Sequence, residues 1–161
     1  MTTCAFTGHR EIKAAHQVGL SDLLLRAIGF AYNKGCRRFI TGGALGFDTV
    51  AAREVLRFRL SHPDVLLIVF VPCLDQDMSW SARQRDAYDY ILSSADEVKF
   101  ISEKYDASCM KRRNQAMAEE CDIMIGYVGR DRSGAAQTYR MASMLGRECY
   151  NLYFELEKGC F

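Results

Sequence analysis

Two nearly continuous apolar runs, VLLIVFV at residues 65–71 and IMIGYV at residues 123–128, most constrain how this chain can fold. A strand that is apolar throughout must be buried on both faces. Such burial is typical of a parallel sheet with helices packed on either side, whereas a half-exposed strand alternates apolar and polar residues. The two runs therefore predict a covered parallel sheet.

Strand-like and helix-like segments alternate along the chain. The expected strands are residues 3–6, 38–41, 65–71, 97–101, 123–128 and 149–154. Between them, apolar residues recur at the spacing of a helical face. We therefore predict an α/β fold, a single Rossmann-like domain over residues 1–161 with a doubly wound, mainly parallel sheet flanked by helices. Ligands of such sheets bind beyond the carboxyl ends of the strands, near the point where the strand order reverses.

The cysteine and histidine spacing, the lengths of the apolar stretches and the net charge argue against several classes of protein. The seven cysteines are never closer than eleven residues apart and form no CxxC pair, and the three histidines stand apart from them. This spacing predicts a reduced, cytoplasmic protein with neither a disulfide framework nor a metal site. No stretch is long enough to cross a membrane, and no signal peptide is evident. The formal net charge of +1 gives no global attraction to nucleic acid, which is therefore not the expected partner.

The segment TGGALGFD, residues 41–48, follows an expected strand and opens an expected helix. Its glycines, Gly42, Gly43 and Gly46, permit a tight turn, and the unpaired amides of a helix start attract anions. Asp48 is placed either to cap the helix or to accept a ribose hydroxyl. The alternative is a plain strand-to-helix turn, because the segment matches neither GxGxxG nor a P-loop.

The segment RDRSGAAQT repeats this layout after the second apolar run. Gly134 would leave room for a phosphate or sugar at a helix start, while Ser133 as a simple N-cap is the alternative interpretation. Near the amino terminus, CAFTGHRE places Gly8, His9 and Arg10 directly after the first strand. We interpret these three residues as a ligand-facing loop.

Two further segments carry candidate residues. The loop VPCLDQDMSW contains Gln76 and the single tryptophan, Trp80, which would either stack on a base or anchor the loop. The anchor is the favoured interpretation. The helix start MKRRNQAM places basic residues where the helix dipole disfavours them, so Arg113 and Asn114 are expected to reach inward to ligand oxygens.

Taken in order, TCAFTGHR, TGGALGFDTVAARE, VPCLDQDMSW, RRNQAM, CDIMIGYVG and SGAAQT resemble the YpsA-like branch of the SLOG superfamily, which also includes the DNA-processing protein A and LOG groups. The resemblance spans about residues 3–152. It implies a nucleotide-derived ligand, such as ADP-ribose or an NAD relative, with no required cofactor, and it suggests a homo-oligomer. The positions that match family motifs are Gly8, His9, Arg10, Gly42, Gly43, Gly46, Asp48, Gln76, Trp80, Arg113, Asn114 and Gly134.

The sequence departs from the family pattern at two places. Ser133-Gly134-Ala135 stands where many relatives have Gly-Gly-Thr, so a hydroxyl contact to phosphate is missing there. Thr138 stands where the LOG phosphoribohydrolases have a catalytic glutamate, which argues against LOG-type hydrolysis. The leading hypothesis is a ligand sensor that is not an enzyme. The alternatives are hydrolysis of an N-glycosidic or phosphate bond, with Asp48, Asp75 or Asp77 as the carboxylate, and single-stranded DNA binding.

Overall fold

Six strands form one sheet in the order β4-β3-β2-β1-β5-β6, and every neighbouring pair is parallel. A computed structural model describes residues 2–159 of the chain; Cys160 lies outside this part. The strands are β1 (Thr3–Gly8), β2 (Arg38–Thr41), β3 (Leu66–Cys73), β4 (Glu97–Ser102), β5 (Ile123–Tyr127) and β6 (Glu148–Asn151). The predicted parallel sheet is confirmed, and both apolar runs form strands.

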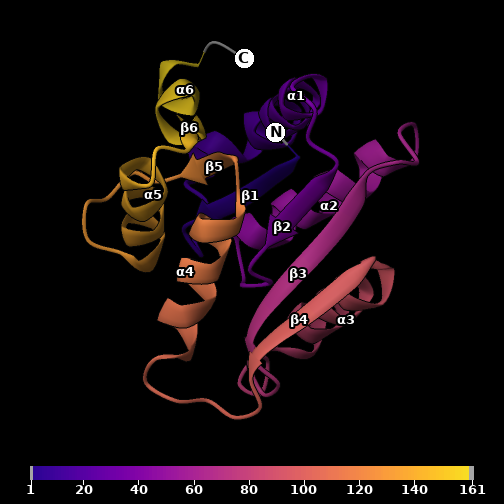
Figure 1. The fold of residues 1–161 in the computed structure, drawn as a ribbon, viewed down its shortest axis with the longest axis vertical. Helices are drawn as coiled ribbons and strands as arrows, with labels where there is room; N and C mark the ends of the chain where they lie inside the picture. Colours follow the sequence, from indigo (N-terminus) through magenta and orange to yellow (C-terminus); the bar gives the residue numbers. More distant parts are fainter. Residues whose placement is uncertain (1, 160–161) are drawn as a thin grey trace.

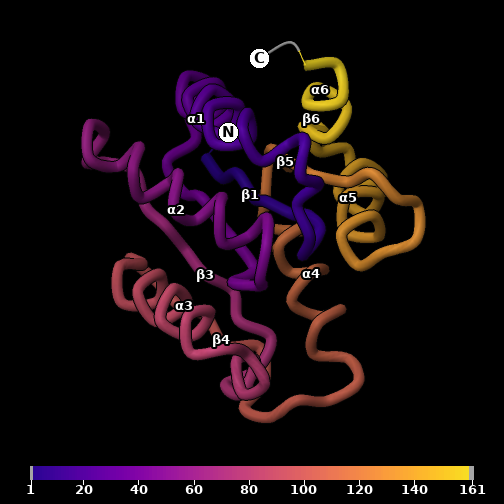
Figure 2. Tube along the Cα trace, turned by 180° about the vertical axis from the view of Figure 1, so that it is seen from behind, coloured from indigo at the N-terminus to yellow at the C-terminus, as the bar shows by residue number. Residues whose placement is uncertain are grey.

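Helices cover both faces of this sheet (Figure 1). One face carries α1 (Gln17–Asn33), α2 (Phe47–Arg59), α3 (Ala82–Ser94) and α6 (Leu152–Lys158), and a short 3-10 turn, η1 (Ala14–His16), precedes α1. The other face carries α4 (Cys109–Glu120) and α5 (Gly134–Met144). Figure 2 shows the first group from behind, with α1, α2 and α3 side by side. The fold is therefore doubly wound, as the sequence predicts.

Burial follows position in the sheet. Every residue of β5 is buried, as are the first five of β1, because both strands lie between two helical layers. The edge strand β4 keeps partly exposed side chains on both faces. The apolar composition of β3 and β5 is thus explained by central or covered positions, since burying apolar surface is the main favourable contribution to folding.

The strand order reverses at β1. From β1 the chain adds β2, β3 and β4 toward one edge, then returns to place β5 on the other side of β1. The connections that leave β1 and β5 therefore run to opposite faces and open a crevice at the carboxyl ends of these strands. This is where the fold positions a ligand site.

The prediction for the last strand is partly wrong. Residues 149–154 were expected to be extended throughout, but β6 ends at Asn151 and α6 begins at Leu152. The Asn151 side chain accepts a hydrogen bond from the Tyr153 backbone N–H at 3.1 Å and caps the new helix. Leu152 and Leu156 then bury one face of that helix, a pattern that suits a helix as well as a strand.

Within residues 2–159, no helix combines the length and apolar character needed to cross a membrane. Six cysteines fall in this range, and all are free thiols.

Candidate functional site

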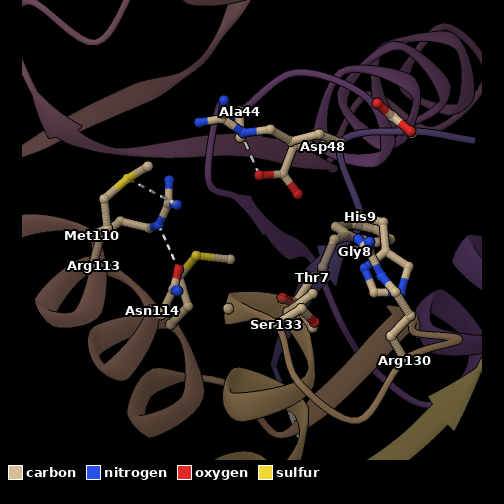
Figure 3. Close-up of a pocket in the computed structure, with 16 residues that line it drawn as sticks. Thr7, Gly8, His9, Ala44, Asp48, Met110, Arg113, Asn114, Arg130 and Ser133 are labelled. Atoms are coloured by element: carbon tan, nitrogen blue, oxygen red, sulfur yellow. Dashed lines mark hydrogen bonds between the residues drawn. The ribbon is translucent and has the colours of Figure 1, made fainter.

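A cavity of about 460 Å³ lies at the carboxyl ends of β1 and β5, at the reversal of strand order (Figure 3). The loops after β1 and β5, the start of α2, the helix α4 and the start of α5 form its walls. Its lining residues are Phe6, Thr7, Gly8, His9, Arg10, Glu11, Ala44, Asp48, Met110, Arg113, Asn114, Met117, Arg130, Ser133, Gly134 and Ala135. Seven of the twelve sequence candidates are in this set.

Arg113 provides a buried positive charge in the wall of the cavity. It lies in the first turns of α4 and is only 5% exposed. Its Nε donates to Asn114 Oδ1 at 2.7 Å, its Nη1 donates to the Gly42 carbonyl, and its Nη2 reaches only Met110 Sδ at 3.9 Å. Within residues 2–159 no carboxylate forms an ion pair with Arg113. Burial lowers its pKa, but a guanidinium stays charged near neutral pH.

Asp48 is the acidic group closest to this charge. It is 6% exposed, and its Oδ2 accepts a hydrogen bond from the Ala44 N–H at 3.2 Å. Burial raises the pKa of Asp48 to about 6, against the opposing effects of Arg113 and Arg10. A Cβ at Gly42 would lie 2.6 Å from Arg113 Nη1 and 2.8 Å from Asp48 Oδ2, so only glycine lets both groups close around this turn. The positive charge is permanent, while the negative charge is easily neutralised.

His9 contributes an unused hydrogen-bond donor. Its Nε2 accepts from the Gly129 N–H at 2.8 Å, which places the ring proton on Nδ1. Nδ1 is buried and has no partner among the described residues. Burial, and to a lesser degree the charge of Arg130, lowers the pKa of His9, so the ring is neutral. A buried N–H without an acceptor is costly, and the described residues leave this one unsatisfied.

The first turn of α2 is partly occupied by the chain itself. The Phe47 N–H donates to the His9 carbonyl at 3.1 Å, and the Arg10 carbonyl lies where a Cβ of Gly46 would be. Gly46 is the N-cap, so the expectation that Asp48 caps α2 is wrong: Asp48 lies inside the first turn. The physical reason is the positive φ of 79° at Gly46, which turns the chain into the helix two residues early.

The first turn of α5 is open by comparison. Ser133 is its N-cap, as one interpretation predicted, and its Oγ accepts from the Ala136 N–H at 3.0 Å. Gly134 faces the cavity, and the nearest atom to a Cβ built there is Asn114 Nδ2, 3.7 Å away. Thr138 is buried, and its hydroxyl donates back to the Gly134 carbonyl at 2.8 Å, so it belongs to the helix and not to the cavity.

Five sequence candidates lie outside the cavity lining. Gly42 and Gly46 shape its border through the contacts described above. Gln76 Nε2 donates to the Gly43 carbonyl at 3.3 Å and to the Tyr88 hydroxyl at 3.2 Å. Trp80 packs edge-on against Tyr88, with ring centroids 5.1 Å apart. The long loop is thus held by its own contacts, in agreement with the anchor interpretation of Trp80.

Glu11 and Arg130 are charged cavity residues that sequence reasoning did not select. Both are exposed, and both follow the carboxyl end of a strand that borders the crevice. That position is the signal that could have found them, because the loops after β1 and β5 lie at the reversal of strand order.

Comparison with known proteins places the chain in a family. The YpsA model, described as the YspA SLOG family, matches residues 7–154. The chain belongs to the YspA SLOG family. The UPF0398 protein of Bacillus thuringiensis strain Al Hakam is 32% identical over 141 residues, which cover 85% of this chain and 77% of the relative. The resemblance stated from the motifs is therefore confirmed.

Two solved structures share the fold of this SLOG protein. DNA processing protein A of Streptococcus pneumoniae aligns with a TM-score of 0.65 and 20% identity over 92% of this chain. The chain spans about half the length of that protein, 49%. DNA processing protein A of Helicobacter pylori, described with a single-stranded DNA binding mode, aligns with a TM-score of 0.65 and 19% identity over 98% of this chain and 73% of its own. At these identities the likeness establishes the fold alone.

Proposed function

We propose that this SLOG protein binds a phosphate-containing nucleotide derivative in the cavity between β1 and β5. The observation that carries the proposal is a buried cation and an unsatisfied donor in the lining of one cavity. Arg113 is buried and forms no ion pair within residues 2–159, and its Nη2 has only the sulfur of Met110 as a partner. His9 lines the same cavity, and its Nδ1 is a buried donor without an acceptor in that part of the chain. A phosphate would supply oxygens and negative charge to this pair of side chains.

The other polar groups of the cavity suit the rest of such a ligand. Arg10 and Arg130 add exposed positive charge at the rim, and the start of α5 offers a positive dipole end beside Gly134. Glu11 and Asn114 can form hydrogen bonds with ribose hydroxyls. ADP-ribose, NAD and AMP are therefore the appropriate probes, since all three combine phosphate with ribose.

The test is calorimetric titration of ADP-ribose, NAD and AMP into the wild type and into Arg113→Met. Methionine keeps much of the side-chain length but removes the charge, so we expect a 10- to 100-fold weaker Kd, the effect of about 1.5–3 kcal/mol for a hydrogen bond to a charged group. Lys111→Met is the matched control, because Lys111 is exposed on the same helix and does not line the cavity. Binding by none of the probes at millimolar concentration, or equal effects of the two variants, would contradict the proposal.

A hydrolase is the second candidate, because Asp48 is a buried carboxyl with a pKa near 6 that faces the cavity. Such a group can exchange a proton near neutral pH, as cleavage of a glycosidic bond requires. The position that carries a glutamate in the LOG enzymes holds the buried Thr138, which argues for binding without turnover. Product analysis with nucleotide monophosphates separates the two: turnover that disappears in Asp48→Asn would favour the enzyme.

Single-stranded DNA binding is a third candidate, favoured by the structural likeness to the Helicobacter pylori protein. Its test is a gel shift with an oligothymidine strand at two salt concentrations. Binding through phosphates would weaken steeply as salt rises. The absence of a shift at low salt would remove this candidate.

A further inference from the structure

A second groove, of about 540 Å³, lies between α2 and α3 next to the first cavity. These helices are neighbours on the face seen in Figure 2. Its lining residues are Arg10, Glu11, Leu45, Gly46, Thr49, Val50, Arg53, Arg83, Gln84 and Ala87. Apart from Arg10 and Glu11, none of these residues lines the cavity between β1 and β5.

The second groove is partly apolar and has positively charged side chains at its rim. Leu45, Val50 and Ala87 provide apolar surface, and the exposed Arg53 and Arg83 stand on α2 and α3. Guanidinium planes stack on aromatic rings and donate hydrogen bonds to ring and ribose oxygens. Three arginines against one carboxylate, Glu11, make the groove net positive. This combination suits a nucleobase attached to an anionic linker.

The two hollows share one wall. Arg10 and Glu11 line both of them. The wall is fixed to the start of α2, because the His9 carbonyl accepts from the Phe47 N–H and the Arg10 backbone packs against Gly46. Arg10 is exposed and lines both the cavity and the groove, so its guanidinium is available to a ligand that extends from one to the other.

We propose that the ligand of this protein is a dinucleotide whose two nucleoside units are joined through a pyrophosphate. One nucleoside unit and the pyrophosphate occupy the cavity between β1 and β5, where the pyrophosphate faces Arg113 and extends to the wall at Arg10. The second nucleoside lies in the groove between α2 and α3, beside Arg53 and Arg83. This proposal rests on the proposed function and adds to it the class of ligand and the site of its second half.

The experiment compares AMP, ADP and diadenosine diphosphate by calorimetry. Diadenosine diphosphate carries the same pyrophosphate as ADP but adds a second adenosine, so a gain over ADP measures the second groove. We expect diadenosine diphosphate to bind at least tenfold more tightly than ADP to the wild type. In Arg53→Ala/Arg83→Ala this gain is lost, because the groove has lost its rim, while the Kd of ADP stays within about twofold.

Arg57→Ala is the matched control. Arg57 lies on α2, its side chain is 62% exposed, and its ion pair is with Glu54, outside both hollows. The variant should bind all three probes as the wild type does. Retained ADP binding also reports that the double variant is folded.

The outcomes distinguish the two proposals. If ADP binds but the second adenosine adds nothing, or if Arg53→Ala/Arg83→Ala weakens ADP and diadenosine diphosphate equally, the second-groove proposal is overturned and the proposed function stands. If neither ligand binds the wild type, both proposals fail.

Discussion

The helices α2 and α5 both begin beside a glycine that follows a strand, yet their first turns have different uses. At α2, the chain's own His9 and Arg10 carbonyls occupy the space beside Phe47 and Gly46. At α5, the space beside Gly134 opens into the cavity, and the nearest atom to a Cβ there is 3.7 Å away. Two similar glycine turns can therefore have different functions. The turn at the start of α2 fixes the wall of the cavity, and the turn at the start of α5 leaves room for a ligand.

The substitutions Gly46→Ala and Gly134→Ala give the largest contrast between the two helix starts. At Gly46 the new Cβ would lie 2.0 Å from the Arg10 carbonyl oxygen, at a φ of 79° that side chains rarely adopt. We expect a loss of more than about 3 kcal/mol in the free energy of unfolding. Gly134→Ala should change it by less than about 0.5 kcal/mol, because the added methyl group has space.

Urea denaturation measures both variants. Equal losses would mean that the Arg10 backbone does not pack on the start of α2 as described. A large loss at Gly134 alone would reverse the comparison.

The pH dependence of ligand binding tests the charge at the start of α2. Asp48 has a pKa of about 6 in the folded protein, so its carboxylate becomes negative above that pH and repels an anionic ligand. If the bound ligand favours the protonated form, affinity falls as pH rises from 6 to 8, by at most about tenfold per pH unit because one proton is linked. ADP-ribose is the right probe, since its phosphates do not titrate in this range.

Asp48→Asn should flatten this profile and bind at pH 8 more tightly than the wild type. A profile unchanged by the substitution would show that Asp48 does not face the bound anion.

The smallest expected effect concerns the cap of α5. Ser133→Ala removes the acceptor for the Ala136 N–H and should cost about 1 kcal/mol in unfolding free energy. Ser143→Ala, at an exposed position of the same helix, is the control and should have little effect. A loss of several kcal/mol in Ser133→Ala would mean that the start of α5 is packed as tightly as that of α2.

Local patterns in the sequence determined the architecture of this protein. The continuous apolar runs required burial on both faces, the helical periodicity between them supplied the covering layers, and Ser133 identified the start of α5. The helix dipole disfavours a cation at a helix start, so the sequence also predicted that Arg113 points inward, and Arg113 is buried. Each of these patterns involves only neighbouring residues, so it can be recognised in the sequence without knowledge of the tertiary structure.

Only the tertiary structure decided which candidates share a site. The return of β5 to the side of β1 brought His9, Asp48 and Arg113 around one cavity and left Gln76 and Trp80 to the loop beside Tyr88. The tautomer of His9 depends on the Gly129 N–H, 120 residues away along the chain. Desolvation likewise depends on everything packed around a group, so neither the raised pKa of Asp48 nor the free donor of His9 could be seen in the sequence.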